Sequence, residues 1–155
     1  MKKYTLIFLL SIILFGEDNF FKYDNYFKKY GEKYNISYIL LKTIALTEND
    51  KLDPDIVRKN KNKSKDIGLM QINTLWIKEL PKFHLSEKKL KNIDINIEVS
   101  AYILSRLIKK YGYSWNTIGM YHSKTKKYKK KWIQRAKKKV KYIIKKDNHI
   151  KLKED

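Results

Sequence analysis

Residues 37–48 read Ser-Tyr-Ile-Leu-Leu-Lys-Thr-Ile-Ala-Leu-Thr-Glu, and this stretch decides how the rest of the chain folds around it. A helix over these residues is apolar on nearly every face, so we expect it to be buried. Glu48 ends the stretch, where its carboxyl group meets a dry surface on one side. Desolvation disfavours the charged form of an acid, which makes it an effective proton donor near neutral pH. Glu48 is therefore the candidate catalytic acid, and the alternative is an exposed residue at a helix end.

Helical periodicity continues on both sides of this segment, and no alternating strand pattern stands out. We predict one all-α domain. Residues 49–65 are polar, contain Pro54 and are expected to form a long functional loop. The other helices are expected over Asp24–Lys33, Leu69–Leu80, a segment opening at Ser86, Ile95–Tyr111, a segment capped by Ser114, and about Thr125–Lys145.

The N-terminus has the pattern of a secretory signal peptide. Lys2 and Lys3 precede an apolar stretch of about ten residues that is too short to span a bilayer, and Gly16 follows it. We expect a signal peptide over residues 1–16, a folded domain over 17–146 and a polar tail over 147–155. The protein is then exported, and a bacterial periplasm is the expected location. An uncleaved membrane anchor is the alternative.

The composition bounds the partners and excludes several chemistries. The formal net charge is +20, and the basic excess concentrates beyond residue 124, which favours binding to a polyanion. The alternative is that these lysines are only solvated. The chain has no cysteine, so disulfides, zinc–thiolate sites and a thiol nucleophile are excluded. We expect a monomer with neither cofactor nor metal.

Two further polar clusters follow Glu48: Asp66-Ile-Gly-Leu-Met-Gln71, and Tyr121-His122-Ser123 after Gly119. A Gly-Leu-Met-Gln motif alone is a weak signal, but all three clusters in this order and spacing are specific. Over roughly residues 27–144 the chain resembles the lytic transglycosylases of the soluble-lytic-transglycosylase (SLT) type. The Tyr-His-Ser ending is most similar to the small members that accompany secretion systems and pili.

This resemblance implies a lysozyme-like all-α fold and an enzyme that acts on peptidoglycan. The implied reaction cleaves the β-1,4 bond between N-acetylmuramic acid and N-acetylglucosamine and leaves a 1,6-anhydromuramoyl end. Glu48 would first protonate the glycosidic oxygen and then, as a carboxylate, take the proton of the muramic 6-hydroxyl.

Asp66 is a possible second carboxylate. Hydrolysing glycosidases commonly pair two carboxyl groups, so Asp66 opposite Glu48 would make the protein a lysozyme-like muramidase. The alternative is a loop aspartate that caps the following turn. The residues themselves do not separate these two roles.

The remaining motif residues are candidates for substrate binding. Gly68 allows backbone to approach a sugar, and the Gln71 amide both donates and accepts hydrogen bonds. The resemblance implies that Met70 lines the site and that the Tyr121 hydroxyl holds Glu48. His122 is a candidate for substrate contact, with a structural role as the alternative.

Asn49 departs from the family pattern, in which serine commonly follows the acid. It is a further candidate for substrate contact, and it leaves open an inactive relative that only binds the cell wall. A nucleic-acid or membrane-surface binder is supported by charge alone, and the export signal and the absence of a nucleic-acid motif count against nucleic acid.

Overall fold

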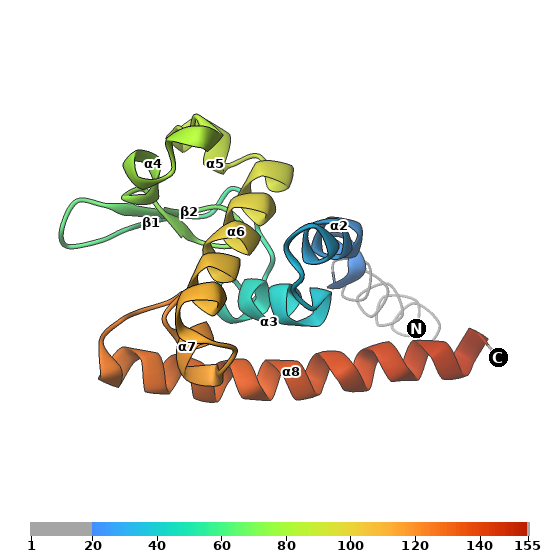
Figure 1. Ribbon diagram of the computed structural model, residues 1–155. Coiled ribbons are helices and arrows are strands. Elements are labelled where there is room, and N and C mark those ends of the chain that lie inside the picture. The colour runs from blue at the N-terminus through green and yellow to red at the C-terminus, as the bar shows by residue number, and fades with distance from the viewer. Residues whose placement is uncertain (1–19, 155) are drawn as a thin grey trace, which may run out of the picture.

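The computed structural model describes residues 20–154, with side-chain surroundings up to residue 148, and these form a mostly helical domain. The buried helix is α3 (Tyr38–Glu48), in which nine consecutive residues from Leu40 to Glu48 are buried. It packs between α2 (Asp24–Tyr34) and the long α8 (Lys126–Glu154). Figure 1 shows α8 along the base of the domain, with α3 and α7 resting on it. Because α3 has no polar face, it needs these neighbours on all sides.

Helix α6 (Ile93–Tyr111) stands against α2 and carries buried Val99 and Ile103 into the core. The short helices α5 (Glu87–Leu90) and α7 (Trp115–Gly119) flank it. Ser86 and Ser114 cap them as predicted, each accepting a hydrogen bond from the backbone N–H three residues on. Ser37 occupies the N-cap position of α3 without making such a bond.

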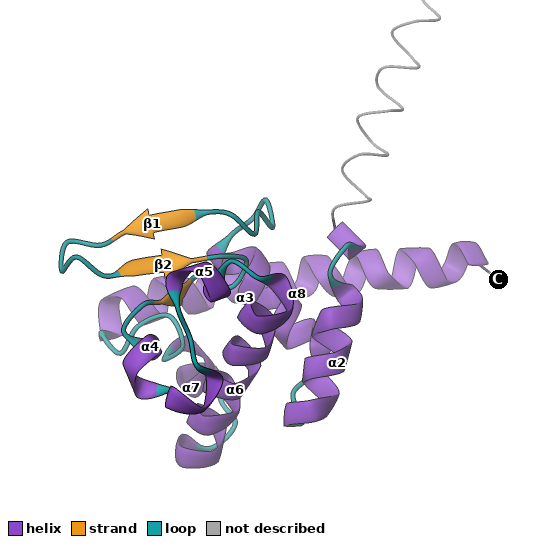
Figure 2. Ribbon diagram, turned by 90° about the horizontal axis from the view of Figure 1, so that it is seen from above, coloured by secondary structure: helices purple, strands orange, loops and turns teal. Residues whose placement is uncertain are grey.

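A small antiparallel sheet corrects two sequence predictions. Its strands are β1 (Val57–Lys59), β2 (Lys65–Ile67) and β3 (Ile72–Asn73), in the order β1-β2-β3. The hairpin of β1 and β2 projects to one side of the helices (Figure 2). The predicted loop over 49–65 therefore contains β1, and the predicted helix over 69–80 is reduced to α4 (Trp76–Glu79), followed by a 3-10 turn, η1 (Pro81–Phe83). Strands of two or three residues are too short to show alternation.

Helix α8 is 29 residues long and extends the predicted last helix as far as Glu154. The segment 147–155, which we expected to be a polar tail, is thus helical through residue 154. The apolar side chains of Trp132, Ala136 and Ile143 on this helix are buried, whereas Tyr128 is exposed. Within residues 20–154, no helix is long and apolar enough to cross a membrane. The predicted signal peptide over 1–16 lies outside the described residues.

Candidate active site

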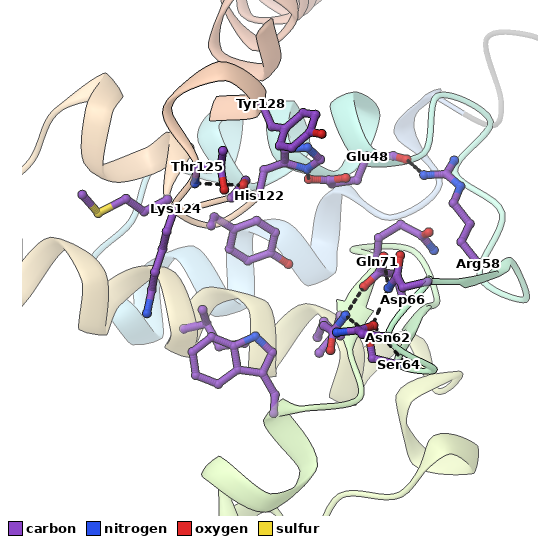
Figure 3. A pocket seen from close by; sticks show the side chains of 18 of the residues that line it. Glu48, Arg58, Asn62, Ser64, Asp66, Gln71, His122, Lys124, Thr125 and Tyr128 are labelled. Atoms are coloured by element: carbon purple, nitrogen blue, oxygen red, sulfur yellow. Dashed lines mark hydrogen bonds and ion pairs between the residues drawn. The ribbon is translucent and has the colours of Figure 1, made fainter. Parts of the chain in front are cut away.

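A pocket of about 790 Å³ opens between the end of α3, the β1–β2 hairpin and the junction of α7 with α8. Figure 3 shows Glu48 and His122 in contact on one side of the pocket, with Asp66 and Gln71 on the side of the sheet. Both polar clusters and Glu48 therefore contribute to one cavity. The other lining residues are Arg58, Asn60, Lys61, Asn62, Ser64, Ile72, Asn73, Trp76, Ile103, Met120, Tyr121, Ser123, Lys124, Thr125 and Tyr128.

Glu48 is only 9% exposed and is held by residues from three other elements. Its Oε1 accepts a hydrogen bond of 2.9 Å from the Trp132 indole and shares a second hydrogen bond of 2.9 Å with Nδ1 of His122. The Arg58 guanidinium donates to its backbone carbonyl over 2.8 Å. Oε2 makes no hydrogen bond within residues 20–148, so this oxygen is the one available to a ligand in the pocket.

These contacts decide where a proton on Glu48 resides. An indole N–H is a donor only, so Oε1 must act as an acceptor from Trp132 in either ionisation state. An ionised Glu48 can only accept, so in that state His122 donates to it through Nδ1–H. If His122 keeps this tautomer, a protonated Glu48 carries its hydrogen on Oε2. The His122 ring stacks on Trp132 at 5.9 Å between centroids and 13° between planes. The geometry thus prepares a carboxyl group with one fixed oxygen and one reactive oxygen.

Tyr121 lines the pocket, but its hydroxyl does not hold Glu48 as the resemblance implied. The hydroxyl donates to the Met70 carbonyl over 2.9 Å and accepts from the Ser100 hydroxyl over 2.9 Å. Burial raises the pKa of Tyr121 above its usual value, so the phenol stays neutral. Its role is to tie α6 and α7 to the turn that precedes β3.

Asp66 lies on β2 and lines the pocket together with Glu48. Its two carboxylate oxygens accept hydrogen bonds from the Asn60 amide at 3.0 Å and the Asn73 amide at 2.7 Å. The alternative of a turn cap is wrong, because both partners are side chains of the sheet region. A carboxylate held by two amides presents a fixed negative charge to the cavity.

Gln71 also lines the pocket, in the left-handed backbone region at φ 51°. Its amide nitrogen donates to the Gly68 carbonyl over 2.8 Å. Its amide oxygen is buried and has no hydrogen-bond partner among the described residues. That oxygen is an unused acceptor, because a buried polar atom normally has a partner.

Three predicted substrate-binding residues do not line the pocket. Gly68 has φ 79°, and a Cβ there would lie 2.6 Å from both the Asn96 amide and the Leu90 carbonyl, so the glycine is required by packing inside the protein. Met70 is fully buried, and its backbone N–H donates to Asn96. Asn49 is 2% exposed and exchanges hydrogen bonds with the backbone of Asp53, closing the loop after α3.

The chain was also compared with known proteins. Residues 25–145 match the family model described as the transglycosylase SLT domain. The chain belongs to this family. Invasion protein IagB of Salmonella typhimurium is 42% identical over 93 residues, which cover 59% of this chain and 58% of that protein. Protein IpgF of Shigella flexneri is 38% identical over 104 residues, covering 66% and 68%. A peptidoglycan-binding-like protein of Escherichia coli O157:H7 is 33% identical over 128 residues, covering 78% and 75%.

Sequence reasoning missed several residues of this SLT domain's pocket. Trp132 lies on the buried face of the last helix, and helical periodicity alone does not indicate that its indole reaches a carboxyl group 84 residues away. Arg58 and Trp76 lie in segments whose structure was predicted wrongly. Tyr128 could have been found as an aromatic residue close to the Tyr-His-Ser cluster.

Proposed function

We propose that the protein is a peptidoglycan lytic transglycosylase that cleaves the bond between N-acetylmuramic acid and N-acetylglucosamine. The observation that carries this proposal is the burial and hydrogen bonding of the Glu48 carboxyl group. The acid is buried at the end of α3, fixed through Oε1, and has Oε2 unengaged within the described residues at a cavity large enough for sugar rings. Membership of the SLT family and the name of the E. coli relative support a peptidoglycan substrate.

The proposed reaction uses Glu48 twice. Protonated Oε2 gives its hydrogen to the glycosidic oxygen as the bond from that oxygen to C1 of the muramic residue breaks, which releases the N-acetylglucosamine 4-hydroxyl. The muramic 6-hydroxyl oxygen then bonds to C1, and its proton passes to the Glu48 carboxylate. The product is a 1,6-anhydromuramoyl end, no water is consumed, and Glu48 returns to its starting state.

Two other pocket groups are suited to the sugar and to the positive charge that develops at C1. The Asp66 carboxylate is a fixed negative charge in the same cavity, which stabilises an oxocarbenium-like transition state. The Gln71 side chain lines the same cavity, and an amide can hydrogen-bond to a sugar N–H or O–H group. If the protein were a hydrolase, Asp66 would be the second carboxylate of a reaction in which water is consumed.

The cellular role belongs to the same proposal. We infer that the protein is exported to the periplasm and opens the wall locally for a secretion or pilus apparatus. The basic and apolar N-terminal stretch supports export. The Salmonella relative is named an invasion protein, which supports a role in a specialised assembly.

Mass spectrometry of the products from purified peptidoglycan tests the chemistry. The proposal predicts anhydromuropeptides from the wild-type protein. Reducing-end muropeptides that disappear in Asp66→Asn would assign a hydrolase with two carboxyl groups. Wall binding without any product would make the protein a binding module.

A further inference from the structure

Helix α8 carries a stripe of lysines on the side away from the domain. Residues 127, 130, 131, 138, 141 and 145 recur at intervals of three, four and seven, which places them on one face of a helix. All six are exposed lysines. At a rise of 1.5 Å per residue, the stripe runs for about 27 Å.

The charge of this stripe is not neutralised by any acidic side chain among residues 20–148. The sequence has no aspartate or glutamate from residue 126 to residue 146. The six lysines make no hydrogen bond or ion pair with the residues that the structure describes. Asp147, the next acid along the chain, is half-buried and accepts a hydrogen bond from the Tyr38 hydroxyl. An extended row of free cations is suited to a partner with repeated negative charges.

The stripe begins where the pocket ends. Lys124, Thr125 and Tyr128, at the start of α8, line the cavity that contains Glu48. In Figure 1 the helix continues from this end along the whole base of the domain. The end of the stripe at Lys127 therefore lies next to residues that line the pocket.

Packing of the opposite face argues against a membrane as the partner. The apolar side chains of Trp132, Ala136 and Ile143 are buried against the domain. An interfacial helix binds a bilayer by inserting its apolar face, and here that face is occupied.

We propose that the lysine stripe of α8 binds the carboxylates of the peptide stems on peptidoglycan, outside the catalytic pocket. This inference rests on the proposed function, because it assumes that peptidoglycan is the substrate. The stripe holds the enzyme on stem-bearing wall while the neutral sugar backbone occupies the cavity. It gives the protein a preference for glycan that still carries its peptides.

The test measures co-sedimentation of the full-length protein with peptidoglycan sacculi, in a Glu48→Gln background that prevents digestion. One variant changes Lys127, Lys131, Lys138 and Lys141 to Gln. A matched control changes Lys78, Lys88, Lys91 and Lys109 to Gln, four exposed lysines of other elements with the same loss of charge. Sacculi are used intact or stripped of their stems by an amidase.

The α8 variant is expected to bind intact sacculi about ten-fold more weakly, because each exposed ion pair contributes a modest factor. The control should bind as the parent does. Removal of the peptide stems should weaken binding of the parent protein to the level of the α8 variant. Added salt should weaken only the part of the binding that depends on the stems. Equal affinity of the α8 variant and its control for intact sacculi would overturn the proposal, as would an α8-dependent loss confined to phosphatidylglycerol vesicles or to DNA.

Activity separates this proposal from the proposed function. With Glu48 present, the α8 variant should digest stem-free glycan at the wild-type rate. If the wild-type protein releases no product from either form of glycan, the proposed enzyme is wrong whatever the sedimentation shows. If digestion is normal and the stripe has no effect on binding, only the inference about the stripe is wrong.

Discussion

The Trp132 indole N–H donates a hydrogen bond of 2.9 Å to Oε1 of Glu48, joining the last helix of the chain to the end of its central helix. Trp132 is 1% exposed, so water does not compete for this bond. The contact makes α8 part of the site as well as part of the core. With His122 as the Nδ1–H tautomer, Oε2 is the oxygen that carries the proton of the acid.

Trp132→Phe is expected to lower the rate of wall digestion roughly ten-fold, because the loss of a buried hydrogen bond that leaves its partner unsatisfied costs about 1–3 kcal/mol. Stability should also fall, since the smaller ring leaves a cavity. The control is Trp115→Phe, a half-buried tryptophan that also lies near α8 but makes no contact with Glu48. Rates are compared at a temperature where all three proteins are folded by circular dichroism. Equal rates in the two variants would contradict a positioning role for Trp132.

The second donor to Glu48 allows a finer test. His122→Phe retains a ring that can stack on Trp132 but removes the donor to Oε1, and we expect digestion to slow several-fold. His122→Asn restores an N–H donor and should recover part of the rate. The melting temperature should change little in either variant, because a third of the His122 side chain is exposed. A loss of activity that follows the melting temperature instead would indicate a structural role.

Substitutions at Gly68 and Gly112 can be compared to separate the effect of close packing from the effect of backbone strain. Both have φ near 80°, but only at Gly68 would a Cβ collide with neighbouring atoms. Gly68→Ala should cost roughly 3 kcal/mol or more of unfolding free energy, through overpacking and backbone strain together. Gly112→Ala should cost about 1–3 kcal/mol, through strain alone, because φ 78° with ψ 165° is a conformation that residues other than glycine rarely adopt. Urea denaturation measures both, and equal losses would show that packing around Gly68 is not the cause.

A buried ion pair offers a test of the core that involves pH. Lys42 is fully buried, and its amine lies 2.9 Å from the Asp24 carboxylate. Burial lowers the pKa of Lys42 and raises the pKa of Asp24. Lys42→Met should cost about 3–5 kcal/mol at pH 7, because it leaves a buried carboxylate without a cation, whereas Asp24→Asn with Lys42→Met should cost much less.

The sign of the pH effect follows from the raised pKa of Asp24. A folded state that holds the proton more tightly than the unfolded state gains stability as pH falls. The deficit of the single variant should therefore shrink between pH 7 and pH 5 in urea titrations, while the double variant shows no such change. A deficit that is constant with pH would exclude an ionised Asp24 as its cause.

The sequence was informative where patterns are long. The apolar run of α3, the periodicity of α6 and the caps at Ser86 and Ser114 predicted the helical domain, because helix period and capping are local. The strands were missed because their two or three residues carry too little pattern. The turn at Gly68 was located, but its purpose was assigned to substrate instead of to the buried amide of Asn96.

The catalytic acid of the site could be predicted from the sequence, but the residues that hydrogen-bond to it could not. Glu48 stood out because an ionisable residue ended a buried helix. The partners of Glu48 depend on which segments meet in space. The family resemblance implied Tyr121 as the residue that holds the acid, and it gave no such role to Trp132. A hydrogen bond between residues 84 positions apart leaves no local trace in the sequence.

The most direct measurement of the central claim is the rate of peptidoglycan digestion by Glu48→Gln compared with the wild-type protein. Glutamine retains the shape and the acceptor oxygen for Trp132 but cannot donate a proton to a glycosidic oxygen. The account predicts a fall of at least about 1,000-fold, with the circular-dichroism spectrum preserved. A folded Glu48→Gln protein that still digests the wall near the wild-type rate would contradict it.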